Sequence, residues 1–113
     1  MRRIETTFAS QWLERVMDAV RTLRVPHQMS ASEVRFADRD TAHQEVYRGS
    51  TYMIPWQIRT RLEVFVGDKE ASDVLDAILG AFDEDPRIDG VVVVSGIEEA
   101  IRIRTGQRGD YAL

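Results

Sequence analysis

The chain begins with an alternation of apolar and polar side chains. Over residues 2–9, one face carries Ile4, Thr6 and Phe8, while arginine, glutamate and threonine occupy the other. The same period of two returns over residues 57–66, where every second residue from position 58 onward is apolar or threonine. A period of two predicts a strand with one buried and one exposed face. We therefore predict two half-buried strands.

Two further segments carry apolar residues at steps of three and four. The first runs from Ser10 to Leu23, and the second follows Asp68 and ends before an acidic turn. This spacing gives each segment one apolar stripe, as in a helix that packs on a core. Ser10 and Asp68 are suitable N-cap residues, and Pro26 stops the first helix. The predicted buried stripe of the second helix consists of Val74, Leu75, Ile78, Leu79 and Phe82.

The remaining segments complete the order of elements. A weaker extended stretch covers residues 29–35, and the β-branched run 91–94 is typical of a strand that is buried on both faces. Residues 36–55 are polar and follow neither period, which indicates a long working loop. The order is strand, helix, strand, loop, strand, helix, strand. It predicts an α+β fold, a ferredoxin-like βαββαβ sandwich that forms a single domain over residues 1–113.

Composition narrows the classes of function. The chain has 113 residues, no cysteine and a formal net charge of −4. Disulfide and thiolate chemistry are therefore excluded, and broad binding to nucleic-acid phosphates is disfavoured. The first residues lack the apolar core of a signal peptide, and no apolar run approaches the length of a membrane span. We expect a soluble protein that stays in the cytoplasm and does not insert into a membrane.

Arg102 and Arg104 are the most distinctive local candidates for chemistry, because they alternate with two isoleucines. If this segment is extended, both guanidiniums leave the same face and can converge on one anion through forked hydrogen bonds. Alternatively, each arginine forms an ordinary surface ion pair with a nearby carboxylate such as Glu99. The residues by themselves leave both interpretations open.

Two motifs resemble the PII signal-transduction family. YRGSTY at 47–52 is similar to the loop signature of that family, with Thr51 where an acidic or small residue is usual. IRIRTGQRGDYAL at 101–113 is similar to its closing segment. The opening MRRIE and the EVR at 33–35 extend the likeness over nearly the whole chain. The resemblance implies a homotrimer of ferredoxin-like subunits, with nucleotide clefts between them.

The resemblance also implies which residues contact the nucleotide. Arg102 and Arg104 match arginines that reach the phosphates from the neighbouring subunit, and Arg39 and Arg59 match basic residues at the base of the long loop. The positions that match the adenine and ribose pocket are Met29, Ser30, Glu63 and Val64. An ordinary structural role within a strand is an equal alternative for these four residues.

The phosphate turn, at about 83–90, departs from the family pattern. The family has Thr, three residues and Gly-Asp-Gly-Lys, whereas the stretch from position 84 is Glu-Asp-Pro-Arg-Ile-Asp-Gly-Val. Asp89 and Gly90 are retained, but Glu84 and Val91 replace a threonine and a lysine. A carboxylate about 5 Å from a phosphate charge repels it by roughly 3 kcal/mol at an effective dielectric of about 20. We therefore expect ADP or AMP to be favoured over ATP.

The base of the long loop differs from the family as well. Residues 36–40 are Phe-Ala-Asp-Arg-Asp, where the family has Gly-Phe-Gly-Arg-Gln. Asp40 thus replaces a glutamine that helps to hold magnesium and 2-oxoglutarate. Its oxygen can ligate magnesium, but its charge opposes a dicarboxylate, and a metal site without the ATP γ-phosphate is incomplete. Because some PII-like branches respond to bicarbonate, this smaller anion is the alternative effector that we expect.

The long loop is expected to carry the signal to a partner. In the family it inserts into a membrane transporter or embraces a metabolic enzyme, and the apolar anchors for such a contact would include Tyr52 and Trp56. The expected effector or loop-contact residues are Asp40, Tyr47, Tyr52 and Trp56. Tyr52 also matches a tyrosine that some members have uridylylated. The alternative for Trp56 is packing within its own trimer.

Other functions have less support. The nearest is a conventional nitrogen-regulatory PII protein that responds to ATP and 2-oxoglutarate. A ferredoxin-like RNA-binding module shares the order of elements, but Phe8 and Phe65 do not make the aromatic cluster of such modules. His27 and His43 are isolated histidines, which disfavours an enzyme and a zinc site. We therefore predict a non-catalytic regulator.

Overall fold

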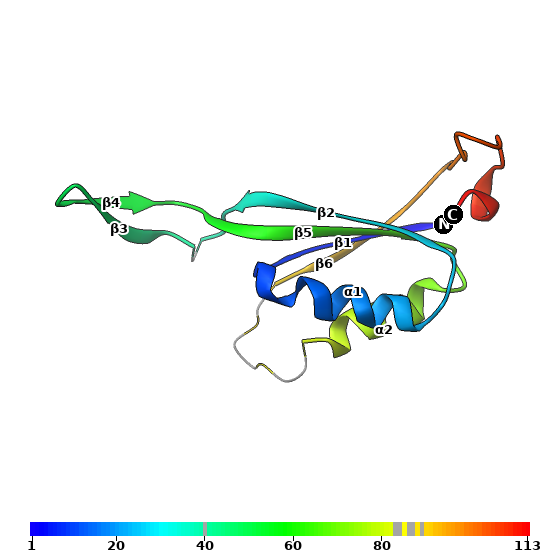
Figure 1. Ribbon diagram of the computed structural model, residues 1–113, viewed down its shortest axis with the longest axis horizontal. Coiled ribbons are helices and arrows are strands. Elements are labelled where there is room, and N and C mark those ends of the chain that lie inside the picture. The colour runs from blue at the N-terminus through cyan, green and yellow to red at the C-terminus, as the bar shows by residue number, and fades with distance from the viewer. Residues whose placement is uncertain (40, 83–84, 86–87, 89) are drawn as a thin grey trace.

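A four-stranded sheet covered on one face by two helices forms the body of the protein (Figure 1). The computed structural model describes residues 1–39, 41–82, 85, 88 and 90–113. The strands are β1 (Arg2–Phe8), β2 (His27–Phe36), β5 (Gln57–Val66) and β6 (Val92–Gly96), and the helices are α1 (Leu13–Thr22) and α2 (Ala71–Gly80). The sheet order is β2-β5-β1-β6, and all neighbouring strands are antiparallel. The predicted α+β class is confirmed, and the strand order agrees with a ferredoxin-like sandwich.

The core lies between the sheet and the helices. Alternate residues of β1 and β5 face the helices, as their sequence period of two predicts. The largest fully buried side chains are Ile4, Val16, Val20, Leu62, Val64, Val66, Val74 and Ile78. Each contributes about 1.5–3 kcal/mol through its removal from water. At one end the rings of Trp12 and Phe8 both pack on the Phe82 ring. The ring centroid of Trp12 lies 5.9 Å from that of Phe82, and the centroid of Phe8 lies 5.5 Å from it.

Neither helix uses its predicted N-cap. A short 3-10 turn, Ser10–Trp12, precedes α1, and the Ser10 hydroxyl lies 2.8 Å from the Thr60 hydroxyl instead of capping. The residue before α2 is Glu70, while Asp68 accepts a hydrogen bond from the Met1 amine at 2.8 Å. Both cap predictions are wrong, because a partner distant in sequence competes for each side chain.

Two predictions of burial are also wrong. The run 91–94 was expected to be buried on both faces, yet Val93 and Val94 are 48% and 42% exposed. The reason is that β6 is an edge strand, and the helices cover only one face of the sheet. Leu79 of α2 is 51% exposed although its neighbours Ile78 and Ala81 are buried, so its side chain lies on the outer side of the last helical turn.

The segment between β2 and β5 forms an arm that projects from one end of the body (Figure 1). It contains a hairpin of β3 (His43–Tyr47) and β4 (Ser50–Ile54), so the expectation of a loop without strands is wrong. Arg48 and Gly49 connect the strands with φ values of 52° and 78°. Two successive positive φ values are typical of a type I′ hairpin turn. A hairpin exposed on both faces needs no apolar alternation, which is why the sequence period was absent.

In the described part of the chain, no helix has both the length and the apolar character that a membrane crossing requires.

Candidate ligand-binding site

Two cavities flank the sheet, one near each end of β5. The arm-side cavity, of about 380 Å³, is lined by Phe36, Arg59 and Gly90 among others. The C-terminal cavity, of about 970 Å³, is lined by Phe65, Arg102 and Arg104 among others. The predicted phosphate contacts therefore divide into two groups. Within one chain they do not converge on one point.

Arg59 supplies the positive charge in the described lining of the arm-side cavity. Its guanidinium lies over the Phe36 ring, 4.0 Å from the ring centroid, and its Nη2 donates to Gln57 Oε1 at 3.3 Å. Glu5 and Asp38 add carboxylates to the lining, and Arg59 is the one cation among the described lining residues. A single guanidinium offers a forked pair of donors to one small anion. The cavity can therefore hold a singly charged group more readily than several adjacent negative charges.

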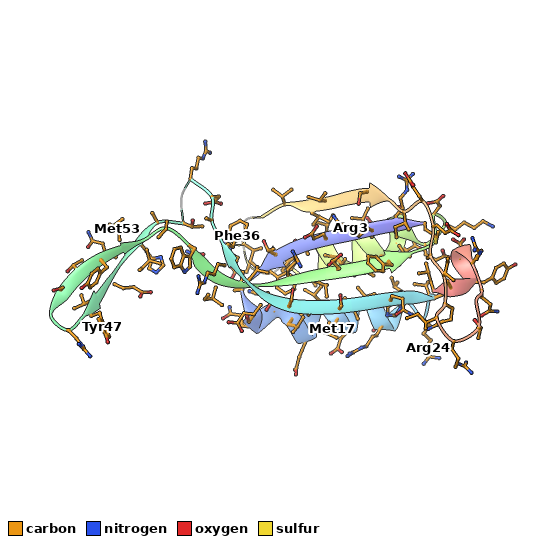
Figure 2. All side chains as sticks on the ribbon, turned by 90° about the horizontal axis from the view of Figure 1, so that it is seen from above. Arg3, Met17, Arg24, Phe36, Tyr47 and Met53 are labelled. Atoms are coloured by element: carbon orange, nitrogen blue, oxygen red, sulfur yellow. The ribbon has the colours of Figure 1, made fainter. Side chains whose placement is uncertain are left out.

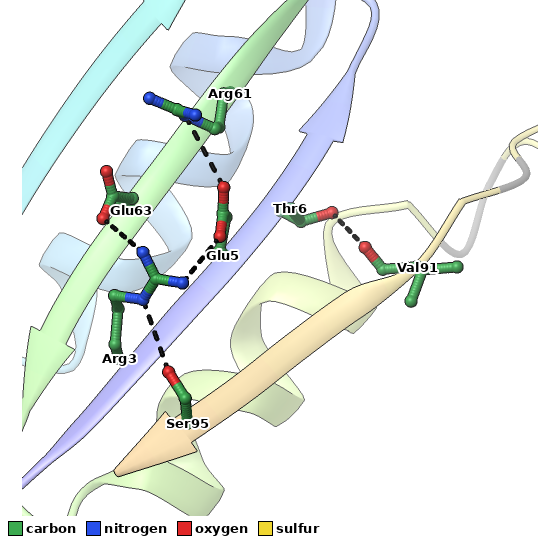
Figure 3. Close-up of polar contacts among 7 residues, drawn as sticks. All are labelled: Arg3, Glu5, Thr6, Arg61, Glu63, Val91 and Ser95. Atoms are coloured by element: carbon green, nitrogen blue, oxygen red, sulfur yellow. Dashed lines mark hydrogen bonds and ion pairs between the residues drawn. The ribbon is translucent and has the colours of Figure 1, made fainter. Parts of the chain in front are cut away.

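The end of the phosphate turn is attached to β1. Thr6 Oγ1 donates to the Val91 carbonyl at 3.2 Å (Figure 3), and a Cβ added to Gly90 would lie 3.6 Å from the Thr7 carbonyl oxygen. Gly90 thus brings the backbone close to the sheet, while Val91 is 72% exposed beside the cavity. The predicted ligand contacts Asp89 and Asp40, and the replacement Glu84, lie outside the described residues. Arg39 is exposed in the arm, next to the cavity residue Asp38.

Arg102 and Arg104 lie in a tight loop, so the expectation of an extended segment is wrong. The amide of Arg102 donates to the Gln107 carbonyl at 2.8 Å, and the amide of Gly106 donates to the Arg102 carbonyl at 2.8 Å. Gly106 has a φ of 72°, a left-handed conformation that favours glycine and turns the chain back. Both arginines nevertheless line the same cavity, and Glu99 pairs with Arg108 instead.

The four predicted adenine and ribose contacts lie on two neighbouring strands. Met29 is directly opposite Val64, and Ser30 is directly opposite Glu63. Val64 is fully buried and Met29 packs against the core, so both point toward the helices. Ser30 and Glu63 therefore lie on the uncovered face of the sheet, because neighbouring residues of a strand face opposite sides. Because the Val64 side chain is buried, a ligand on the uncovered face could contact only the backbone atoms of Val64.

The uncovered sheet face carries a cluster of compensated charges (Figure 3). Arg3 contacts Glu5 at 3.1 Å, Glu63 at 3.3 Å and the Ser95 hydroxyl at 3.3 Å. Arg61 lies 3.6 Å from Glu5. Two arginines thus face two glutamates, and this part of the face is not basic. An RNA-binding sheet needs a basic face, so the cluster argues against that function.

The predicted contact residues of the arm are accessible. Tyr47 and Tyr52 are 60% and 51% exposed, and Figure 2 shows Tyr47 and Met53 projecting from the hairpin. Arg48 lies over the Tyr47 ring, 5.3 Å from its centroid. Trp56 is half-buried at the base of the arm, with the Arg35 guanidinium 5.2 Å from its ring centroid. The aromatic side chains of the hairpin can therefore meet another surface.

Sequence reasoning missed Thr41, which joins the two ends of the arm. Thr41 is 3% exposed, and its hydroxyl lies 3.0 Å from the Pro55 carbonyl oxygen and 3.1 Å from the Asp38 carbonyl oxygen. It also accepts a hydrogen bond from the Asp38 amide at 3.0 Å. We name these contacts the Thr41 clasp. A threonine in a polar stretch has no sequence signal that distinguishes it from its neighbours.

The described residues contain no group of three or more His, Cys, Asp or Glu side chains placed to hold a metal ion. The cavities offer guanidiniums, which suit an anion, beside carboxylates, which oppose one, and the hairpin offers an exposed contact surface. The fold and the site therefore define a class, namely a ferredoxin-like sandwich with open cavities beside its sheet and a projecting hairpin arm.

No protein-family model matches the chain. The Nitrogen regulatory protein P-II of Cereibacter sphaeroides is 33% identical over 113 residues, which cover 100% of both chains. The protein of the same name from Rhodobacter capsulatus is 32% identical over 113 residues, again 100% of both chains. Nitrogen regulatory protein P-II 2 of Methanothermobacter thermautotrophicus is 32% identical over 113 residues, 100% of this chain and 97% of that protein.

The chain belongs to the nitrogen regulatory protein P-II family. The predicted family is thereby confirmed. The prediction of a non-catalytic regulator is confirmed with it, because the relatives are regulatory proteins by name.

Proposed function

We propose that the chain is a cytoplasmic, homotrimeric sensor that binds ADP or AMP in clefts between subunits. Through its arm it would control a membrane transporter or a metabolic enzyme. The observation that carries this proposal is the separation of the two cavities. Arg59 and Phe65 line different cavities and are six residues apart on β5, about 20 Å at 3.3 Å per residue. A second copy can bring Arg102 and Arg104 to the ligand that Arg59 holds.

The uncovered apolar residues support assembly. β6 is an unpaired sheet edge with half-exposed valines, and Ile103 and Tyr111 of the C-terminal segment are 101% and 82% exposed. An apolar edge strand left open to water is a site for association with other chains. Light scattering should give a mass three times that of the 12.9 kDa chain. A mass equal to one chain would contradict the intersubunit site.

The arm-side cavity supports the preference for fewer phosphates. Val91 lies where the family has a lysine, and its exposed side chain brings no charge to the cavity. Glu5 and Asp38 add negative charge to the same lining, with Arg59 as the described cation. Each further phosphate brings more negative charge toward these carboxylates, and a pair of like charges about 5 Å apart costs roughly 3 kcal/mol at a dielectric of about 20. ADP and AMP are therefore the favoured ligands.

The same charges favour a small second effector. Bicarbonate carries one negative charge, which one guanidinium can match, whereas 2-oxoglutarate brings two carboxylates. We propose bicarbonate as the effector at the base of the arm, with magnesium dispensable when no γ-phosphate is present. ATP with 2-oxoglutarate remains the conventional alternative for this family.

Calorimetric titration tests the proposal. AMP, ADP and ATP are titrated into the purified protein, each with and without magnesium, 2-oxoglutarate and bicarbonate, and GDP serves as a control for the adenine base. We expect ADP or AMP to bind more tightly than ATP, and bicarbonate to change that affinity. Absence of binding by every adenine nucleotide would overturn the sensor function. ATP binding that is tightened by 2-oxoglutarate would instead establish the conventional alternative.

A further inference from the structure

His43, at the start of β3, lies between two hydrogen-bond acceptors. Its Nδ1 is 3.2 Å from the Thr41 carbonyl oxygen, and its Nε2 is 2.9 Å from Glu45 Oε1. A neutral imidazole carries one N–H and can donate to one of these acceptors only. Both hydrogen bonds exist together when the ring is protonated. The geometry therefore suits the imidazolium ion.

The two acceptors belong to different parts of the arm. Glu45 lies within the hairpin strand β3, whereas Thr41 belongs to the clasp that joins the chain entering the arm to Pro55 at its exit. A doubly bonded His43 thus fixes the backbone between the clasp and the hairpin, because its two acceptors lie two residues before and after it in the chain. The attachment involves exposed side chains at the stem of the hairpin and does not touch the buried core.

We propose that His43 is a proton-operated latch, which holds the stem of the hairpin when protonated and releases it when neutral. Loss of the proton removes one of the two hydrogen bonds, so the hairpin opens more often relative to the body. This inference goes beyond ligand binding, and only its consequence for a partner rests on the proposed function. The arm would then present its contact residues in a way that depends on pH.

The surroundings of His43 favour its protonated form. Glu45 is the carboxylate that faces the ring, and the shared pocket wall is completed by the uncharged residues Ile54, Trp56, Gln57 and Ile58. Two arginines contact residues of this wall, and their charge would oppose protonation. Arg35 lies over Trp56, and Arg59 donates to Gln57.

The carboxylate prevails over these cations. The hydrogen bond to Glu45 raises the pKa of His43 above the ordinary value of 6.5, and the Thr41 carbonyl raises it further. Because the pKa is raised in the latched state, the latch stabilises fully at pH values below the ordinary His pKa of 6.5. It is lost as the pH rises through the pKa of the latched state.

NMR titration of the two histidine rings tests the latch, with His27 as the internal control. His27 Nδ1 faces the Val25 carbonyl at 2.8 Å and lies on β2 within the body. We expect His43 to titrate above its ordinary pKa of 6.5. In the Glu45→Gln protein the His43 titration should move down, while the His27 signals show no response to the substitution. A His43 that titrates at or below 6.5, or that is unmoved by Glu45→Gln, would overturn the proposal.

Hydrogen exchange of the hairpin amides, corrected for the intrinsic pH dependence, supplies the second readout. Their protection should be greater at about pH 5 than at about pH 8. One unit of pKa difference between the latched and the released histidine changes the opening equilibrium of the hairpin tenfold. The protection at about pH 5 divided by that at about pH 8 should therefore equal ten raised to the difference between the measured His43 pKa and its ordinary value of 6.5. His43→Gln should abolish this ratio, and His27→Gln should preserve it. A ratio of one in the unmodified protein, or an unchanged ratio in His43→Gln, would contradict the latch.

Nucleotide titration of the same samples separates this inference from the proposed function. The latch can fail while ADP still binds, and ADP binding can fail while the histidine titration and the exchange ratio persist. Each result therefore identifies which of the two proposals is wrong.

Discussion

The sandwich body and the arm at 37–56 are stabilised by different means. In the body, eight large side chains are less than 2% exposed and lie between the sheet and the helices. In the described part of the arm, Thr41 is the one buried residue. The hairpin depends on its backbone ladder, a two-residue turn and the Thr41 clasp. Apolar burial stabilises the body, and hydrogen bonds hold the arm.

This difference separates stability from signalling. Removing a large side chain from a packed core costs several kcal/mol, whereas a net hydrogen bond contributes about 0.5–1.5 kcal/mol. The arm can therefore open locally at a free energy well below that of global unfolding. A regulator benefits from such an arrangement, because its exposed arm can change while the packed body keeps its shape.

The largest expected effect comes from truncating one side chain in each region. Leu62→Ala removes a fully buried side chain of β5 and should lower the free energy of unfolding by about 2–5 kcal/mol. Met53→Ala alters a hairpin side chain that is 60% exposed, and the free energy of unfolding should change by less than about 0.5 kcal/mol. Denaturant unfolding at equal protein concentrations measures both. Comparable losses would show that the arm contributes to the stability of the body.

The next effect concerns the cavity at the far end of the body from the arm. Under the proposed function Arg104 donates a charged hydrogen bond to a phosphate, so Arg104→Ala should weaken ADP binding by about 1.5–3 kcal/mol, or roughly 10- to 150-fold. Arg21→Ala is the matched control, since Arg21 pairs with Asp18 on the surface of α1. Calorimetry measures the two affinities. An equal affinity in both variants would return Arg104 to the role of an ordinary surface residue.

A smaller effect is expected from opening the clasp. Thr41→Val keeps the shape of the side chain but leaves the Pro55 carbonyl and the Asp38 amide without the hydroxyl. The cost should be about 1–3 kcal/mol and should fall on the arm. Hydrogen exchange should accelerate in β3 and β4 but not in β1 or β5. Acceleration in all four strands would mean that the clasp stabilises the whole fold.

The same contrast explains what the sequence could predict. The strands β1 and β5 bury one face against helices, so Leu62 and its neighbours follow a period of two that is visible in the chain. The hairpin buries neither face, and its strands show no period. Gly49 is a sequence cue for the hairpin turn, but a glycine indicates such a turn only when the segments on both sides of it are already known to be strands.

The errors at β6 and in the C-terminal segment have a common cause. The apolar run 91–94 predicts a buried strand and the isoleucines at 101 and 103 predict an extended segment, yet Val93 is exposed in an edge strand and Ile103 is exposed in a tight loop. A single sequence does not state which strand occupies the sheet edge, where apolar side chains stay exposed. The tight loop at Arg102 follows from the positive φ of Gly106, which overrides the local alternation.

A pair of glycine substitutions gives the smallest and most direct test of the two regions. Gly49 has a φ of 78°, so alanine there should destabilise the hairpin turn by about 1 kcal/mol. Gly80 ends α2 with no positive φ and no atom within 4 Å of an added Cβ, so alanine there should stabilise the body by about 0.4–1 kcal/mol. Hydrogen exchange of hairpin amides should respond to Gly49→Ala alone, and the denaturant midpoint to Gly80→Ala alone. If either change altered both measurements, the arm and the body would be one cooperative unit, and a hairpin that opens independently could not be the reporting element.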